Sequence, residues 1–179
     1  NLKYLKSIEK FLRKHKINKY KIVLEPSKKN TGPAILSTAL IKDIPLNQSM
    51  MIFTADHLIE KLSIFNKAIE NNKKFLTDKN IFVFGIKPKN PSTEFGYFLT
   101  KRIGKINKVK KFIEKPKLLK AKQIIKNNGY WNSGMFYLRK DSIINNFKRY
   151  RPSIYKNCLK AVTKARYINK VYYLNKTCF

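Results

Sequence analysis

Acidic residues are scarce in this chain of 179 residues, and cysteines are scarcer still. Ten Asp and Glu stand against 40 Lys and Arg, which gives a formal net charge of +30. The two cysteines, Cys158 and Cys178, lie apart without partners at metal-ligand spacing, which excludes a disulfide framework and a zinc site of the usual pattern. Because so few cysteines suit a reducing compartment, we predict a cytoplasmic location.

Long hydrophobic runs are also missing. No apolar run approaches the ~20 residues that a helix needs to span a bilayer, and the basic start of the chain lacks the apolar core of a signal peptide. We therefore expect no contact with a membrane. The chain does contain 43% hydrophobic residues, with twelve Phe and ten Tyr, which suffices for one domain with a core.

The excess of positive charge makes nucleic acid the first partner to consider, because Lys and Arg neutralise phosphates. The lysines are spread through every segment, however, and do not mark one binding face. We therefore expect no specific nucleic acid partner, although such a surface would bind polyanions at low salt. A basic nucleic-acid-binding domain remains the alternative.

Hydrophobic periodicity predicts helices that alternate with short apolar strands. Such alternation favours an α/β fold with a mostly parallel sheet, in which ligands bind outside the carboxyl ends of the strands. The segments 95–99 and 109–113 are candidates for a pair of strands. In full, predicted helices cover 2–16, 33–42, 64–75 and 118–128, and predicted strands cover 20–24, 50–54, 81–86, 95–99, 109–113, 135–138 and 171–174.

Asp56 follows the apolar segment 50–54, so its carboxylate would lie at the open edge of a sheet. A hard oxygen ligand at this place suits Mg²⁺. The alternative is that Asp56 caps the next helix, since Asp is a favoured N-cap residue.

Glu114 and Lys115 stand together after a predicted strand and before Pro116. A sugar phosphate would offer hydroxyls to the carboxylate and a dianion to the ammonium, whereas the alternative is a solvated Glu–Lys pair. Asn132 could contact sugar hydroxyls, or the stretch 131–134 could form only a tight turn. Gly96 could admit a ligand to the backbone or merely relieve a bulge.

Four segments in a fixed order carry a resemblance to a known family: 25–34, 55–57, 112–116 and 130–136. Together they resemble the mannose-1-phosphate guanylyltransferases, a branch of the sugar nucleotidyltransferases. The resemblance implies a Rossmann-like, three-layer nucleotidyltransferase fold with a mostly parallel mixed sheet, incomplete at both ends. Residues 1–179 would form a partial catalytic domain, with a nucleotide and metal half at about 1–90 and a sugar-phosphate half at about 91–179.

The same resemblance implies roles for single residues. Lys29 and Gly32 depart from the Arg and Ala that are usual at their positions. The matched residues are Asp56 for the metal, Asp56 and Lys115 for catalysis, Glu25, Asn30 and Thr31 near the nucleotide base, and Gly96, Tyr97, Glu114, Lys115 and Asn132 at the sugar phosphate.

The reaction implied by the resemblance is nucleotidyl transfer with Mg²⁺ as cofactor, from GTP to mannose 1-phosphate, giving GDP-mannose and pyrophosphate. Another sugar-1-phosphate nucleotidyltransferase and a noncatalytic homologue are alternatives, and a homo-oligomer is left open. The family's Gly-rich phosphate loop would lie before Asn1. We therefore expect the chain as given to be inactive alone, with unpaired strand edges that favour aggregation.

Overall fold

A computed structural model describes residues 2–179 and divides the chain into two compact units. The first unit holds the segments up to residue 50, 77–79 and 139–179, and the second holds 51–76 and 80–138. These structural units do not coincide with the functional halves predicted on either side of residue 90, which stay a prediction. No helix among residues 2–179 is long and apolar enough to cross a membrane.

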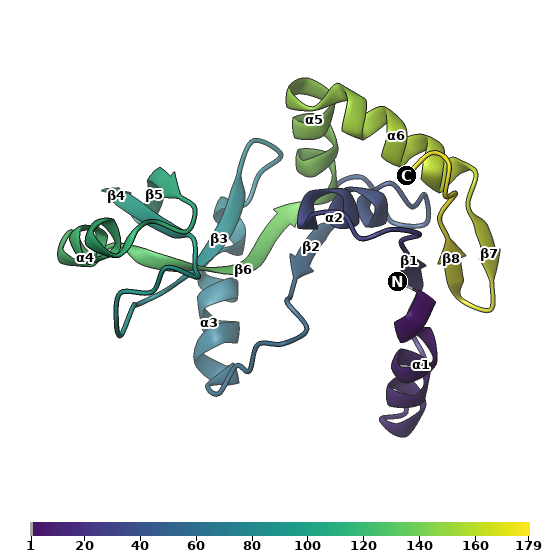
Figure 1. The fold of residues 1–179 in the computed structure, drawn as a ribbon, viewed down its shortest axis with the longest axis horizontal. Coiled ribbons are helices and arrows are strands. Elements are labelled where there is room, and N and C mark those ends of the chain that lie inside the picture. The colour runs from purple at the N-terminus through teal and green to yellow at the C-terminus, as the bar shows by residue number, and fades with distance from the viewer. Residues whose placement is uncertain (1) are drawn as a thin grey trace. The chain divides into compact units, whose positions relative to one another are not determined.

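The first unit contains a small three-stranded sheet (Figure 1). Its strands lie in the order β1-β8-β7, with β8 parallel to β1 and antiparallel to β7. The elements of this unit are η1 (Leu2–Tyr4), α1 (Leu5–Lys14), β1 (Ile22–Leu24), α2 (Thr31–Ala39), α5 (Lys140–Tyr150), α6 (Pro152–Thr163), β7 (Arg166–Ile168) and β8 (Val171–Tyr173).

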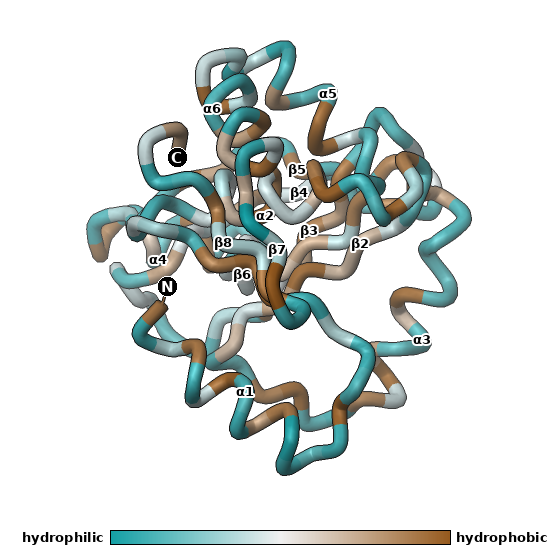
Figure 2. Tube along the Cα trace, turned by 90° about the vertical axis from the view of Figure 1, so that its right-hand side faces the viewer, coloured by the Kyte–Doolittle hydropathy of each residue, from teal (hydrophilic) through white to brown (hydrophobic). Residues whose placement is uncertain are grey.

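Helix α1 forms because its apolar residues recur at helical spacing between lysines. Figure 2 shows this as alternating brown and teal segments along α1. Its Leu5 and Leu12 pack against the buried cluster of Ile22, Leu24 and Val171, so the helix contacts strands β1 and β8 of its own unit. The predicted helix and the strand after it are confirmed.

Helices α2, α5 and α6 pack against one another in the same unit. Leu36 and Ala39 of α2, Ile144 of α5 and Ala161 of α6 are buried. Pro152 begins α6, a position that proline favours because the first helical N–H needs no partner. Neither α5 nor α6 was predicted from the sequence, although Ile143, Ile144 and Phe147 of α5 recur at helical spacing.

The second unit contains most of a five-stranded sheet. Its order is β2-β6-β4-β5, and β3 also pairs with β6. The strands β2 and β6 each cross the boundary between the two units. The elements are β2 (Ser49–Ile52), α3 (Leu62–Asn72), η2 (Lys73–Phe75), β3 (Ile81–Ile86), β4 (Tyr97–Ile103), β5 (Ile106–Ile113), α4 (Leu118–Lys126) and β6 (Tyr130–Arg139).

The predicted mixed α/β fold is confirmed, and the predicted pair 95–99 with 109–113 is the β4–β5 hairpin. Among the described strand pairs with a defined register, β1–β8 is parallel, and β3–β6, β4–β5, β4–β6 and β7–β8 are antiparallel. The sheets therefore hold more antiparallel pairs than the alternation of helices and strands indicated. The reason is that β6 runs antiparallel to both β3 and β4.

Helix α4 ends with a left-handed residue, Asn128, whose φ is 54°. The backbone N–H of Gly129 donates to the Ile124 carbonyl, and that of Asn128 donates to the Ile125 carbonyl, each at 2.9 Å. This is a Schellman motif with Asn in the position that glycine usually takes.

Candidate active site

Three predicted sugar-phosphate residues meet at one end of the second unit's sheet. The register pairs Tyr97 of β4 with the residue before Glu114 on β5 and with the residue before Asn132 on β6. Gly96 therefore shares the next row with Glu114 and Asn132. The backbone N–H of Asn132 donates to the Gly96 carbonyl at 2.7 Å, which holds this row together.

Gly96 leaves room for the carboxylate of Glu114. A Cβ on Gly96 would lie 2.8 Å from Glu114 Oε2 and 2.8 Å from Cζ of Phe112. The register shift in the β4–β5 pair falls between Leu99 and Thr100, so Gly96 is not the residue that relieves it. The close approach to Gly96 instead sets the position of an exposed carboxylate.

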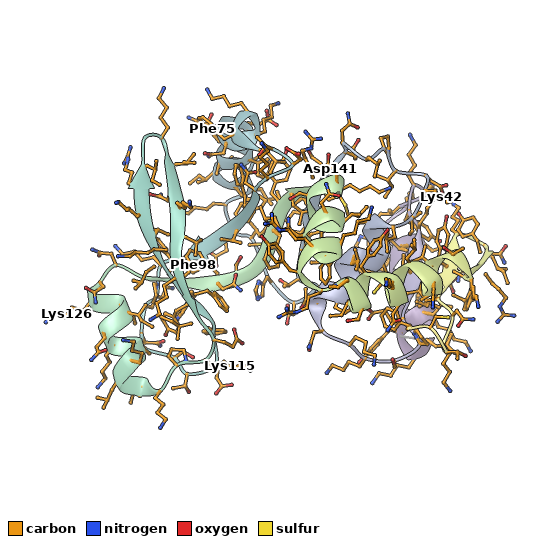
Figure 3. The ribbon with its side chains drawn as sticks, turned by 90° about the horizontal axis from the view of Figure 1, so that it is seen from above. Lys42, Phe75, Phe98, Lys115, Lys126 and Asp141 are labelled. Carbon is orange, nitrogen blue, oxygen red and sulfur yellow. The ribbon has the colours of Figure 1, made fainter. Side chains whose placement is uncertain are left out.

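Lys115 lies between the end of β5 and the start of α4, while Lys126 marks the other end of that helix (Figure 3). The Lys115 side chain is exposed, and its backbone has a left-handed φ of 39°. A non-glycine residue pays about 1–3 kcal/mol for such a conformation, which is common at ligand-binding sites. Pro116, which follows, is buried and anchors the turn.

Tyr97 is fully buried, and its hydroxyl is used within the protein. The hydroxyl donates to the Ser92 carbonyl and accepts from the Ser92 backbone N–H, both at 2.9 Å. Tyr97 therefore closes the loop from Ser92 to Gly96. The structure places its ring in the core, beside Trp131, with a distance of 6.4 Å between the ring centroids.

Asn132 lies within strand β6, and the tight turn considered for this stretch is not formed. Its Oδ1 accepts from the backbone N–H of Gly134 at 3.2 Å. No described residue accepts a hydrogen bond from its Nδ2, which is left for a ligand or water.

Gly134 has φ of 72°, and a Cβ there would lie 3.1 Å from Cγ2 of Thr54. Thr54 comes two residues before Asp56, so Gly134 brings β6 against the Asp56 turn.

Asp56 lies in the turn after β2, with its side chain 85% exposed. Its Oδ1 is 3.9 Å from Nε2 of His57. The N-cap residue of the following helix α3 is Lys61, so Asp56 does not cap that helix. Within residues 2–179, no group of three or more His, Cys, Asp and Glu could hold a metal. A single exposed carboxylate fits Mg²⁺, which commonly binds one or two carboxylates with waters and ligand phosphates.

The predicted nucleotide residues lie in the first unit. Glu25 follows β1, and its Oε1 is buried without a hydrogen-bond partner among the described residues. Burial raises the pKa of the Glu25 carboxyl. Asn30 is the N-cap residue of α2 but makes no side-chain capping bond, and Thr31 is exposed. The start of α2 therefore keeps N–H donors free, which favours a negatively charged ligand.

The structure gives a reason for one departure from the family pattern. A Cβ on Gly32 would lie 2.9 Å from Cζ of Phe147 on α5. The usual Ala at this position would therefore require the Phe147 ring to shift.

Sequence reasoning missed three residues that support the site: Ser92, Thr54 and Phe112. Ser92 binds the Tyr97 hydroxyl, Thr54 contacts the Gly134 position and Phe112 contacts the Gly96 position. Each acts through a neighbour on another strand or loop. No spacing along the chain marks such a contact.

Comparison with known proteins identifies a family and several relatives. The model of the family described as nucleotidyl transferase matches residues 3–176. A mannose-1-phosphate guanylyltransferase of Escherichia coli is 36% identical over 156 residues, which cover 82% of this chain and 34% of the relative. One of Salmonella montevideo is 36% identical over 80% of this chain and 32% of its own length. The chain thus spans about a third of the length of these curated relatives.

Two solved structures resemble this one. A Helicobacter pylori structure described as mannose-6-phosphate isomerase gives a TM-score of 0.85 at 29% identity, covering 99% of this chain and 70% of that chain. A Thermus thermophilus structure described as mannose-1-phosphate geranyltransferase gives a TM-score of 0.69 at 25% identity, covering 80% of this chain and 43% of the other. Both comparisons agree with the nucleotidyltransferase fold expected from the sequence.

Proposed function

Because the chain belongs to the nucleotidyl transferase family, we propose that it takes part in the transfer of a guanylyl group from GTP to mannose 1-phosphate. The observation that carries the proposal is the row of Glu114, Gly96 and Asn132, which lie at the end of β5, at the start of β4 and on β6. This row offers a carboxylate and a free amide at one place, which suits the hydroxyls of a sugar. Similarity to curated mannose-1-phosphate guanylyltransferases supports the choice of substrates.

In the proposed reaction a phosphate oxygen of mannose 1-phosphate forms a bond to the α-phosphorus of GTP. The bond from that phosphorus to the oxygen bridging to the β-phosphate breaks, and pyrophosphate leaves with its electron pair. The products are GDP-mannose and pyrophosphate, and no covalent enzyme intermediate is needed. The protein contributes by positioning and by stabilising charge.

The residues of the second unit would hold the sugar phosphate. Glu114 would accept hydrogen bonds from sugar hydroxyls, and Nδ2 of Asn132 would donate one. Lys115 would bind the phosphate of mannose 1-phosphate, because its ammonium is exposed beside the Glu114 carboxylate in sequence. Gly96 and Tyr97 would not bind the sugar with their side chains. Gly96 would leave space for the Glu114 carboxylate, and Tyr97 would hold the loop that precedes Gly96.

Asp56 would hold the Mg²⁺ ion, since its carboxylate is exposed and forms no short ion pair with the described part of the chain. Bound there, the ion would neutralise negative charge on the phosphates. The turn that carries Asp56 is packed against Gly134 through Thr54, which limits its movement relative to Asn132.

The residues of the first unit would bind the nucleotide. The Glu25 carboxylate would accept hydrogen bonds from N–H groups of the base. Asn30 and Thr31 would contact the nucleotide at the start of α2, where free backbone N–H groups favour anionic ligands.

Pyrophosphate release from GTP and mannose 1-phosphate tests the proposal in an active enzyme that contains residues 1–179. We expect Asp56→Asn to lower kcat at least about 100-fold, as for loss of a charge-stabilising group. We expect Glu114→Gln to raise KM for mannose 1-phosphate about tenfold and to leave KM for GTP unchanged. Glu60→Gln, at an exposed residue outside the site, is the matched control.

Unchanged kcat in Asp56→Asn would overturn the metal assignment, and turnover only with other nucleotides or sugar phosphates would favour a related transferase.

The net charge of +30 supports nucleic acid binding as a second candidate. Titration with single-stranded DNA at two salt concentrations separates the two candidates. An electrostatic contact weakens steeply by ~200 mM salt, so only binding that survives would favour the second.

A further inference from the structure

A cavity of about 370 Å³ lies in the first unit, away from the residues predicted to bind the nucleotide. It is formed by the end of α2, the loop after it, one face of α5 and one residue of α6. Its lining includes Lys42, Ile44, Lys140, Ile144, Lys148 and Tyr155. The volume falls in the range of small-molecule sites.

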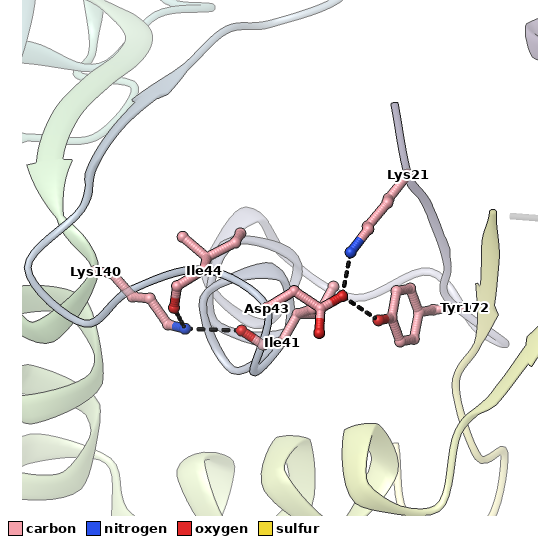
Figure 4. A network of polar contacts seen from close by, with 6 residues as sticks. All are labelled: Lys21, Ile41, Asp43, Ile44, Lys140 and Tyr172. Carbon is pink, nitrogen blue, oxygen red and sulfur yellow. Dashed lines mark hydrogen bonds and ion pairs between the residues drawn. The ribbon is translucent and has the colours of Figure 1, made fainter. Parts of the chain in front are cut away.

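The cavity wall includes a buried lysine with donor capacity to spare. Lys140, the first residue of α5, is 3% exposed. Its Nζ donates to the carbonyl oxygens of Ile41, at 2.7 Å, and Ile44 (Figure 4). An ammonium has three donors, so one is left after these two bonds.

No carboxylate neutralises this ammonium. Within residues 2–179 none lies at ion-pairing distance from Lys140, and the nearby Asp43 is engaged by Lys21 and by the Tyr172 hydroxyl (Figure 4). Burial lowers the pKa of Lys140, although Asp43 opposes that shift. A buried ammonium that lacks an anionic partner gains from an anion supplied from outside.

The other residues that line the cavity suit a ligand that has both a negative charge and an apolar part. Lys42 and Lys148 add two positive charges, and no acidic residue of the described chain lines the cavity. Nζ of Lys148 lies 5.3 Å from the centroid of the Tyr155 ring, which holds this lysine at the cavity. The remaining walls are mostly aliphatic, and a bare inorganic ion would leave them without a partner.

We propose that this cavity binds a small organic anion, with a phosphate or carboxylate head at Lys140 and an apolar or aromatic body against Ile44, Ile144 and Tyr155. This site is additional to the proposed transferase site. None of Glu25, Asn30 and Thr31, the candidate nucleotide residues of the same unit, lines the cavity.

Titration of residues 1–179 with phenyl phosphate tests the proposal, at about 150 mM salt to screen long-range attraction. Isothermal calorimetry gives the dissociation constant, and isoleucine methyl NMR gives the location. We expect saturable binding that shifts Ile44 and Ile144 but not Ile22, which lies in a separate core. We expect phenyl phosphate to bind about tenfold more tightly than inorganic phosphate, because its ring buries apolar surface.

Two lysine variants distinguish a site from general basicity. Lys148→Met should weaken binding of phenyl phosphate about tenfold, whereas Lys156→Met, which removes the same charge from an exposed position of α6, should not. Benzoate in place of phenyl phosphate decides whether the head is a carboxylate or a phosphate. Absence of saturation, equal loss in both variants, or an equal shift of Ile22 would overturn the proposal.

Discussion

The carboxylate of Glu114 lies where a side chain on Gly96 would have to go. Its Oε2 is 2.8 Å from the position of a Cβ on Gly96, and the ring of Phe112 is equally close. Because Gly96 directly precedes β4 and Glu114 directly follows β5, the position of the carboxylate is set by the β4–β5 register. A substitution at Gly96 can therefore test the site without changing Glu114 itself.

We predict that Gly96→Ala displaces Glu114 and raises KM for mannose 1-phosphate about tenfold in an active enzyme containing this chain. The Glu114 carboxylate and the Phe112 ring, which is half exposed, can both move away, so the thermal midpoint should change little. Initial-rate kinetics and a thermal melt check both statements. An unchanged KM, with Glu114→Gln still defective, would mean that the carboxylate does not need this position.

The contact between Gly134 and Thr54 predicts a measurable coupling. Gly134→Ala should cost about 1–2 kcal/mol of unfolding free energy because of its left-handed φ, with an added cost from Cγ2 of Thr54. Thr54→Ser removes that methyl group and keeps the hydroxyl. Urea denaturation of the two single variants and the double variant should show a smaller cost of Gly134→Ala in the Thr54→Ser background. Equal costs in both backgrounds would contradict the contact.

The ion pair of Asp43 with Lys21 should make the free energy of unfolding depend on pH. Its hydrogen bond with Lys21 lowers the pKa of Asp43 from 3.8 and raises that of Lys21 from 10.5. The pair therefore stabilises the fold between these values, and the contribution is lost as the pH falls through the Asp43 pKa or rises through the Lys21 pKa. Asp43→Asn should be less stable than the wild type near pH 7, and the difference should vanish at both extremes.

Urea denaturation across the pH range measures the Asp43 effect. Tyr172→Phe is the matched control, since it removes the hydroxyl bonded to Asp43 and leaves the Lys21 ion pair in place. A difference between wild type and Asp43→Asn that stays constant with pH would sink the prediction.

The buried carboxyl of Glu25 should affect stability in the opposite direction to Asp43, because its pKa is raised. Burial raises the pKa of the Glu25 carboxyl above 4.5, so this group favours folding below pH 4.5 and loses that contribution as the pH rises through its folded pKa. Glu25→Gln should therefore raise the thermal midpoint at pH 7 and leave it unchanged at pH 4. Glu60→Gln, at an exposed carboxylate, should show no such difference. The same gain from Glu25→Gln at both pH values would show that burial of charge is not the cause.

The sequence predicted best those helices and strands whose apolar residues recur at a regular spacing within one short segment. The periodicity of Leu5 and Leu12 predicts α1, and the apolar run 81–86 predicts β3, because the period of a helix or strand is a property of neighbouring residues. The order of the four motifs predicts the family. Helices α5 and α6 were not predicted, although Ile154, Cys158 and Val162 of α6 recur at helical spacing.

By itself the sequence determined the α/β class, the family and the residue types of the candidate site. The tertiary structure decided which of those residues meet: Glu114, Gly96 and Asn132 share a row only because β4 pairs with both β5 and β6. It also placed Tyr97 in the core and left Lys140 without an anionic partner among residues 2–179. Strand register and burial are decided by contacts between residues far apart in the chain, which no local pattern records.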